Sequence, residues 1–179
     1  MNRLFFAVEL EEKTQQEISA RAARLKPLWP RARWVKPPNY HLTMLFIGRY
    51  SGQLSQLEEA GHRAAASRGG MLAACSWGYF PHKSRPRVAF AAVEDRENIL
   101  RGISESLNCI LRSQQNNSFH PHITVARSNG QYPAPSADFG PPVLFACRHI
   151  TLFNSELAPG GPRYTKVACF ALQGIARSE

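Results

Sequence analysis

The 179-residue sequence has few acidic residues, few cysteines and no long apolar run. No stretch approaches the ~20 consecutive apolar residues that span a bilayer, and the first residues lack the pattern of a signal peptide, so no membrane segment is predicted and the cytoplasm is the expected compartment. The four cysteines stand 34, 38 and 22 residues apart. This spacing excludes a Cys-x-x-Cys pair or a zinc site, and it predicts reduced thiols in the core.

Motifs of several common enzyme classes are also missing. The sequence has no Gly-rich loop ending in Lys-Ser or Lys-Thr that would cradle a phosphate, and no Gly-x-Ser-x-Gly turn that would present a nucleophilic serine. The close pair Cys147 and His149 has no evident third partner. These absences exclude the standard P-loop and serine-nucleophile sites.

Basic residues, by contrast, are abundant. There are 22 Lys and Arg against 13 Asp and Glu, 17 of the basic residues are arginines, and the segment 21–36 holds six basic residues and no acid. The planar guanidinium group suits phosphate oxygens, so the composition fits a polyanionic partner, although many soluble proteins are basic without binding nucleic acid. With 44% hydrophobic residues, residues 1–179 fit one domain with a substantial core, or two small lobes packed together as a single two-lobed domain.

Hydrophobic periodicity predicts a mixed order of strands and helices. Segments 11–25, 53–68 and 99–111 have helical patterns, and Asp95 stands where it can cap the third. Strands are predicted at 3–10, 40–48, 71–80, 87–93, from 122 onward, at 143–153 and at 163–172, with a turn at 156–162. Residues 41 and 122 each lie in a predicted strand that is preceded by a helix and then by a proline-containing loop. This repeated order indicates two similar lobes.

A short pattern, His-x-Thr followed by an apolar residue, occurs three times, at 41–44, 122–125 and 149–152. Random order of the same residues would give roughly 0.17 such triplets. Alternate side chains of a strand share a face, so His41 and Thr43 point one way while Leu42 and Met44 point to an apolar side. The second copy repeats this arrangement.

Two imidazoles and two hydroxyls across a cleft suit an in-line displacement at phosphorus. An imidazole with an unperturbed pKa of ~6.5 can take a proton from water or give one to a departing ribose oxygen. Threonine hydroxyls can donate hydrogen bonds to the non-bridging oxygens, where charge develops. The pattern therefore predicts His41 and His122 as the acid–base pair, in either order, with Thr43 and Thr124 at the phosphate.

The other histidines have weaker claims. The third copy lacks the preceding helix and loop, and His149 and Thr151 share a predicted strand face with apolar residues, so we expect them to pack. His120 and His122 form a His-x-His pair that could bind a metal, but no acid lies between Glu105 and Asp138. No metal and no cofactor are predicted.

Five segments of the chain resemble the two-histidine phosphoesterases, and within them the bacterial and archaeal RNA 2′,3′-cyclic phosphodiesterases once named 2′-5′ RNA ligases: RLFFAVEL, HLTMLFIG, RVAFAAV, FHPHITVAR and SELAPGGPRYTKVACFAL. The resemblance implies an α+β, bilobal fold of two pseudo-symmetric lobes, each with an antiparallel sheet and flanking helices, with the motif strands facing a central cleft. It also implies metal-independent hydrolysis of a terminal 2′,3′-cyclic phosphate to a 2′-phosphate.

The same resemblance implies that His122 activates water, that His41 protonates the leaving 3′ oxygen, and that Arg127 contacts the phosphate. Five residues after His122, however, Arg127 would lie on the opposite face of an unbroken strand. An RNA site also favours an aromatic ring on which the terminal base can stack. Phe80 is the candidate for this role, and Tyr164 is a second residue that could reach the cleft.

Two other functions would use the same features. A 2′-5′ RNA ligase would run the reaction backward with the same residues, and a non-catalytic RNA-binding module would depend on segment 21–36. The expected partner is RNA, or nucleotides, with 2′,3′-cyclic phosphate ends, and the expected oligomeric state is a monomer.

Overall fold

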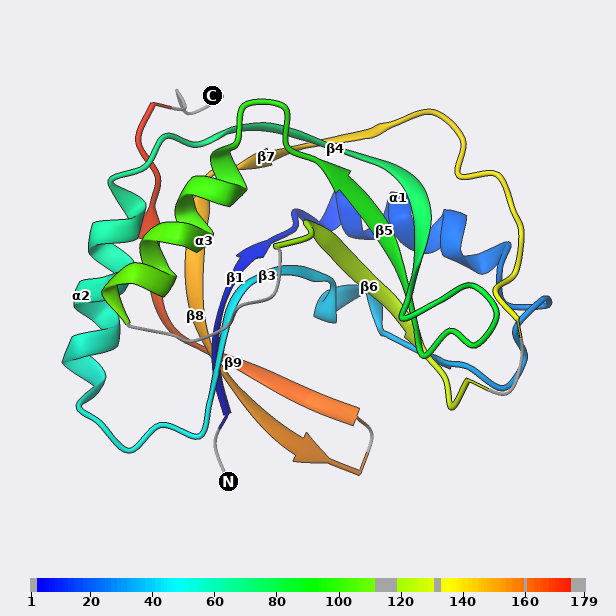
Figure 1. The fold of residues 1–179 in the computed structure, drawn as a ribbon, viewed down its shortest axis with the longest axis horizontal. Helices are drawn as coiled ribbons and strands as arrows, with labels where there is room; N and C mark the ends of the chain where they lie inside the picture. Colours follow the sequence, from blue (N-terminus) through cyan, green and yellow to red (C-terminus); the bar gives the residue numbers. More distant parts are fainter. Residues whose placement is uncertain (1–2, 112–118, 131–132, 160, 175–179) are drawn as a thin grey trace.

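The computed structural model describes residues 3–111, 119–130, 133–159 and 161–174. Within these ranges the chain is an α+β protein with three α-helices, as predicted (Figure 1). The helices are α1 (Glu12–Ala23), α2 (Leu54–Ala65), α3 (Ile99–Ile110) and the short 3-10 helix η1 (Pro37–Asn39). The strands are β1 (Arg3–Glu9), β2 (Arg33–Trp34), β3 (His41–Gly48), β4 (Gly70–Phe80), β5 (Val88–Glu94), β6 (His122–Arg127), β7 (Val143–Cys147), β8 (His149–Ala158) and β9 (Gly161–Ala171).

The strands join into one curled antiparallel sheet, in the order β7-β4-β5-β6-β3-β1-β8-β9, with β2 beside β6. Its centre is narrow, because the register of β3 with β6 holds the single pair Leu42 and Ile123. The sheet thus consists of two four-stranded halves, β7-β4-β5-β6 and β3-β1-β8-β9, that meet at the two motif strands. This arrangement matches the predicted pair of similar lobes.

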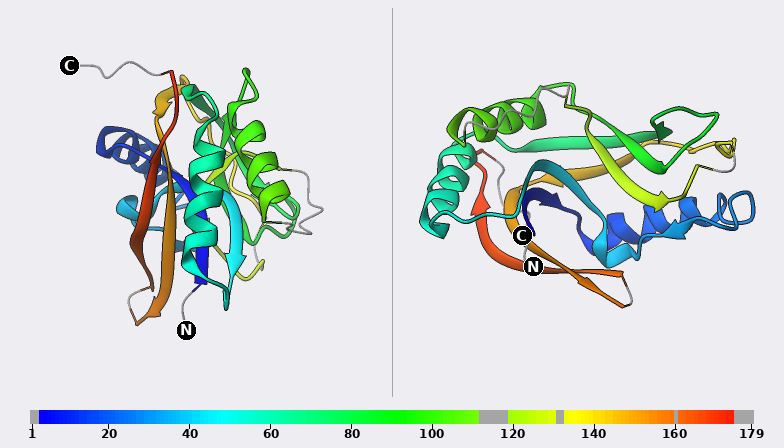
Figure 2. Two further views of the ribbon diagram at one scale, coloured as in Figure 1. Left: turned by 90° about the vertical axis from the view of Figure 1, so that its left-hand side faces the viewer. Right: turned by 60° about the horizontal axis from the view of Figure 1, so that its bottom comes forward.

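The connecting helices cross from one half to the other. Helix α1 follows β1 in the chain but packs against β7, and α3 follows β5 but packs against β3. Figures 1 and 2 show α2 and α3 side by side on the half that contains β8 and β9, with α1 on the opposite half. The helices thereby hold the two halves of the sheet together.

The predicted amphipathic faces are the buried ones. Ile18 of α1 and Leu100, Ile103 and Leu107 of α3 have no exposed surface. The predicted cap of α3 is confirmed, since the Asp95 carboxylate accepts hydrogen bonds from two backbone amides of the helix, at 2.7 and 3.0 Å. The apolar residues of the motif strands, including Leu42 and Ile123, join this same core.

Two strand predictions are wrong in detail. The segment 143–153, predicted as one strand, forms β7 and β8, which pair with β4 and β1 respectively. The chain passes from one half of the sheet to the other at Arg148. The predicted turn at 156–162 is mostly strand, because β8 and β9 pair as far as Ala158 and Gly161.

All four thiols are free, but the prediction that they lie in the core holds for Cys147 alone. Cys75 is half-buried, and Cys109 and Cys169 are exposed. Among the described residues, no helix has the length and apolar character needed to cross a membrane.

Candidate active site

The register at the centre of the sheet brings the two motifs together. Leu42 and Ile123 are partners and point into the core. In an antiparallel pair, the residues flanking such partners lie across from each other on the other face. His41 therefore lies across from Thr124, and Thr43 across from His122, which gathers the four predicted residues on one face.

Both histidines make the same backbone contact. The distance from Nδ1 to the carbonyl oxygen two residues earlier is 2.8 Å for His41, with Asn39, and 2.7 Å for His122, with His120. A carbonyl oxygen can only accept a hydrogen bond, so each Nδ1 carries a proton and donates it. Each Nε2 is left as the ring nitrogen that can take up or release a proton.

Each imidazole also lies among aromatic rings. The centroid of His41 is 5.0 Å from Phe5 and 5.1 Å from Tyr164, and that of His122 is 5.1 Å from Phe90 and 5.3 Å from Phe80. Burial among these groups lowers the pKa of both histidines, because it disfavours the charged imidazolium form. This shift favours the neutral form of both imidazoles.

A bulge lies at the same place in both motif strands. In β3 the register with β1 passes from Thr43 to Leu45 and skips Met44. In β6 the register with β5 passes from Thr124 to Ala126 and skips Val125. An extra residue reverses the alternation of side chains beyond it. The residue five positions after each histidine therefore returns to the histidine's face.

These residues are Arg127 in β6 and Phe46 in β3. In an unbroken strand Arg127 would face away from His122, and the bulge turns it back to the same face. Arg127 is exposed, and its charge contributes to the lowered pKa of both His41 and His122. Phe46 is the equivalent residue of the other half and is 47% exposed. Sequence reasoning missed Phe46, although the equal spacing in HLTMLF and HITVAR would have revealed it.

Phe80 and Tyr164 lie on opposite sides of the site. Phe80 stacks on Phe90 at 4.3 Å and meets His122 edge-on, so it forms part of the wall around that histidine. Tyr164 meets His41 edge-on, and burial raises the pKa of its hydroxyl while the charge of Arg127 opposes that rise. The two rings thus contact different histidines.

The third copy of the motif lies outside this site. Thr151 is buried, as predicted, and its hydroxyl donates a hydrogen bond to the Glu9 carboxylate at 2.6 Å. The prediction that His149 also packs is wrong, because its side chain is exposed. The other Glu9 oxygen pairs with Lys166 at 2.5 Å. Within the described ranges, no three His, Cys, Asp or Glu side chains are grouped so that they could hold a metal ion.

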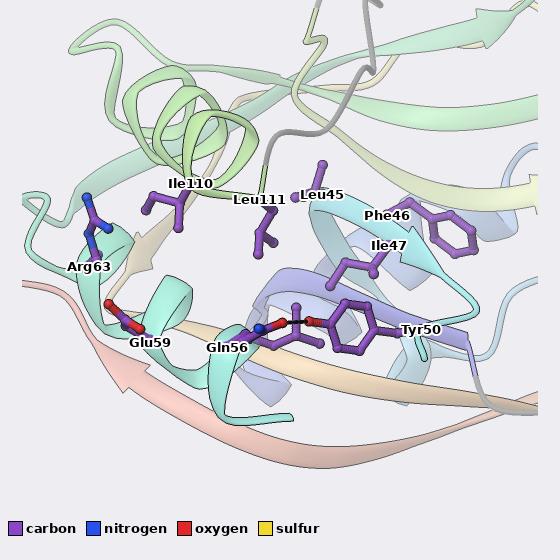
Figure 3. A pocket seen from close by; sticks show the side chains of 10 residues that line it. Leu45, Phe46, Ile47, Tyr50, Gln56, Glu59, Arg63, Ile110 and Leu111 are labelled. Carbon is purple, nitrogen blue, oxygen red and sulfur yellow. Dashed lines mark hydrogen bonds between the residues drawn. The ribbon is translucent and has the colours of Figure 1, made fainter. Parts of the chain in front are cut away.

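Two cavities are lined in part by residues of β3, and of these the smaller one includes a motif histidine. A small one of about 140 Å³ lies beside His41 and is also lined by Glu9, Tyr164 and Lys166. A larger one of about 660 Å³ lies between β3, α2 and α3, where Tyr50 donates a hydrogen bond to Gln56 (Figure 3). Phe46 lines this cavity too, but Figure 3 shows its ring pointing away from the α2 side chains.

The chain is similar to known proteins of one family. The model of the LigT-like phosphoesterase family matches residues 8–90. An RNA 2′,3′-cyclic phosphodiesterase of Thermus thermophilus is 35% identical over 188 residues, covering 96% of this chain and 91% of the relative. One of Escherichia coli is 28% identical over 182 residues, covering 95% and 96%.

Solved structures give the same result. The crystal structure of TT0787 of T. thermophilus has a TM-score of 0.78 and 32% identity, covering 96% of this chain and 98% of that one. The structure of E. coli LigT complexed with 3′-AMP has a TM-score of 0.77 and 26% identity, covering 97% and 99%. The chain belongs to the LigT-like phosphoesterase family.

Proposed function

We propose that this chain hydrolyses 2′,3′-cyclic phosphate ends of RNA, or of nucleotides, to 2′-phosphates. The observation that carries the proposal is the matched pair, His41 and His122, each held by an Nδ1 hydrogen bond to the second residue before it. The relatives named RNA 2′,3′-cyclic phosphodiesterase, which match nearly the whole chain, support the same activity.

The reaction needs one histidine neutral and the other protonated. His122 takes a proton from water at Nε2 as the water attacks phosphorus, and His41 donates its Nε2 proton to the 3′ oxygen as the P–O bond breaks. The pair is near enough for a charge on His122 to lower the pKa of His41, which disfavours the state in which both histidines carry an extra proton. Since the two halves are alike, the assignment of base and acid follows the family resemblance.

The remaining groups bind the substrate in this proposal. The hydroxyls of Thr43 and Thr124 donate hydrogen bonds to the non-bridging oxygens, and the Arg127 guanidinium neutralises the charge that builds on them. The exposed ring of Phe46 offers a stacking surface to the terminal base. Phe80 contacts the substrate on the side of His122, and Tyr164 contacts it on the side of His41.

We also propose that residues 1–179 act as one two-lobed unit and as a monomer in the cytoplasm. Both halves of the sheet contribute one histidine each, so the site needs both. The four free cysteines, two of them exposed, fit a reducing compartment. Light scattering at assay concentrations tests the monomer.

A short RNA with a 2′,3′-cyclic phosphate end tests the activity, with a chelator in parallel reactions. We expect His41→Ala and His122→Ala each to lower kcat by at least about 10²-fold, because each removes a proton-transfer group. His149→Ala, which removes an exposed imidazole of the third copy, is the matched control and keeps full activity.

Four results would count against the proposal. They are undiminished hydrolysis by either folded histidine variant, loss of activity in chelator, a 3′-phosphate product, or end joining that outpaces hydrolysis when a 5′-hydroxyl RNA is added.

A further inference from the structure

A second arginine joins the face of the sheet that carries the two histidines. Strand β2 pairs with the end of β6, and Arg33 is the direct partner of Arg127. Val88 is the partner of Arg127 on the other side, and Phe80 is the partner of Val88. Direct partners in antiparallel strands point to the same side. Arg33 therefore extends a row, Phe80-Val88-Arg127-Arg33, on the face of His122.

The two arginines of this row are exposed and are not neutralised by an acid. Beyond the backbone pairing of their strands, neither the Arg33 nor the Arg127 side chain makes a hydrogen bond or ion pair with another described residue. Like charges directly across a strand pair repel each other unless an anion lies with them. Guanidinium groups bind phosphate oxygens through two parallel hydrogen bonds. The two arginines of the row can thus bind more than one phosphate group.

Other basic residues of segment 21–36 are not placed in this way. Arg21 is half-buried, donates to the carbonyl oxygens of Phe139 and Pro141, and pairs with Glu17 at 2.9 Å, so it has a structural role. Arg24 ends α1 and lies outside the row. Of the arginines in this segment, Arg33 is the one whose partner in the sheet is a residue of the site.

We propose that Arg33 binds the phosphodiester on the 5′ side of the terminal ribose in single-stranded RNA. Resting on the proposed function, this inference assigns Arg127 to the reacting phosphate and Arg33 to the next phosphate along the strand. The Cβ atoms of such cross-strand partners are about 5 Å apart, and both side chains are long, so the two guanidinium groups can reach consecutive phosphates. The site accordingly prefers oligonucleotides to mononucleotides.

The test compares ligands that differ by one nucleoside and the phosphodiester that joins it to the terminal ribose. Dissociation constants are measured for adenosine 2′-monophosphate and for the dinucleotide ApA ending in a 2′-phosphate, with the parent and with Arg33→Gln. We expect the substitution to weaken dinucleotide binding about tenfold, as for the loss of a charge-assisted hydrogen bond, and to leave mononucleotide binding unchanged. For the dinucleotide, the slope of log K against log salt should fall by about 0.7.

Two further variants make the experiment specific. Arg24→Gln removes a charge of the same segment outside the row and should leave both dissociation constants unchanged. Arg33→Lys keeps the charge without the planar fork, so it should keep the salt slope and lose part of the affinity. An equal loss for both ligands, no loss for the dinucleotide, or an equal effect of Arg24→Gln overturns the proposal.

Parallel turnover assays with the cyclic forms of both ligands separate the two proposals. If the parent hydrolyses neither cyclic form but Arg33 still sets the dinucleotide preference, the proposed function fails and the binding inference holds. If both cyclic forms are hydrolysed while the dissociation constants do not depend on Arg33, the binding inference alone fails.

Discussion

Substitution of Gly78 by alanine tests whether the aromatic rings around His122 control its chemistry. Gly78 is the cross-strand partner of Phe90, and a Cβ atom there would lie 2.2 Å from Cε2 of that ring and 2.3 Å from Cζ. An ordinary carbon–carbon contact is about 3.5 Å, so the ring must retreat by about 3.5 − 2.2 = 1.3 Å. Phe80, stacked at 4.3 Å, and His122, at 5.1 Å, adjoin the ring that has to move.

This displacement of the Phe90 ring should lower both the stability and the activity of the protein. Overpacking of this kind destabilises by about 1–3 kcal/mol, and alanine recovers about 0.5–1 kcal/mol of backbone entropy relative to glycine, so we expect a net loss of about 1–2 kcal/mol. For a chain of this size, the loss lowers Tm by about 2–8 °C. Displacement of a catalytic group by about 1 Å can lower kcat/KM by up to about 10²-fold. Displacement of the Phe90 ring also opens the wall around His122 to water, so the His122 pKa should rise toward 6.5.

Thermal unfolding, kcat/KM and an NMR titration of His122 together measure these effects. Gly102→Ala is the matched control, because nothing lies within 4 Å of its added Cβ on the exposed side of α3, and it should stabilise by about 0.8–1 kcal/mol without changing activity. Adding Phe90→Leu to Gly78→Ala should restore Tm but not activity. A fall in Tm with an unchanged His122 titration and an unchanged kcat/KM would refute the reasoning.

Three other predictions concern the site. Because the pKa values of His41 and His122 are lowered by folding, the unfolded chain binds more protons below pH 6.5. The stabilising contribution of the two histidines is thus full above about pH 6.5 and is lost as the pH falls. Urea titrations at pH 7 and pH 5 should therefore show a smaller loss of unfolding free energy for a His41→Asn/His122→Asn variant than for the parent; an equal loss contradicts this. The kcat/KM optimum should lie below pH 6.5, and the kcat optimum higher, because bound phosphate raises both pKa values; two optima above pH 7 contradict this. Phe46→Ala should lower kcat/KM about tenfold for cyclic adenosine phosphate and little for a baseless ribose cyclic phosphate; equal losses contradict stacking.

The sequence was sufficient to predict most of the elements, because each buried face follows a regular period. Ile103 and Leu107 mark the buried face of α3, and Leu42 and Ile123 the buried faces of the motif strands. The crossing at Arg148 was not predictable in this way. The apolar pattern continues through it, and only the partners of β7 and β8, which are distant in sequence, separate the two strands.

The paired histidines were predictable from the repeat itself, but the row beyond them was not. A bulge adds one residue to one strand, and its position depends on the partner strand rather than on local propensity. Without the bulge at Val125, Arg127 faces the core side; with it, Arg127 joins Thr124 on the site face. Arg33 was likewise hidden, since its role depends on a two-residue strand that is defined only by its pairing with β6.

The near-symmetry of the two halves makes their differences informative. The histidines, threonines and bulges are equivalent, so none of these distinguishes acid from base or one end of the substrate from the other. The residues after the bulges are not equivalent, since one half presents Phe46 and the other presents Arg127 with Arg33 beside it. An apolar ring favours a base and a guanidinium group favours a phosphate. In the proposed complex, the substrate lies with its base toward β3 and its phosphates along β6 and β2, and this orientation would give the two alike histidines different roles.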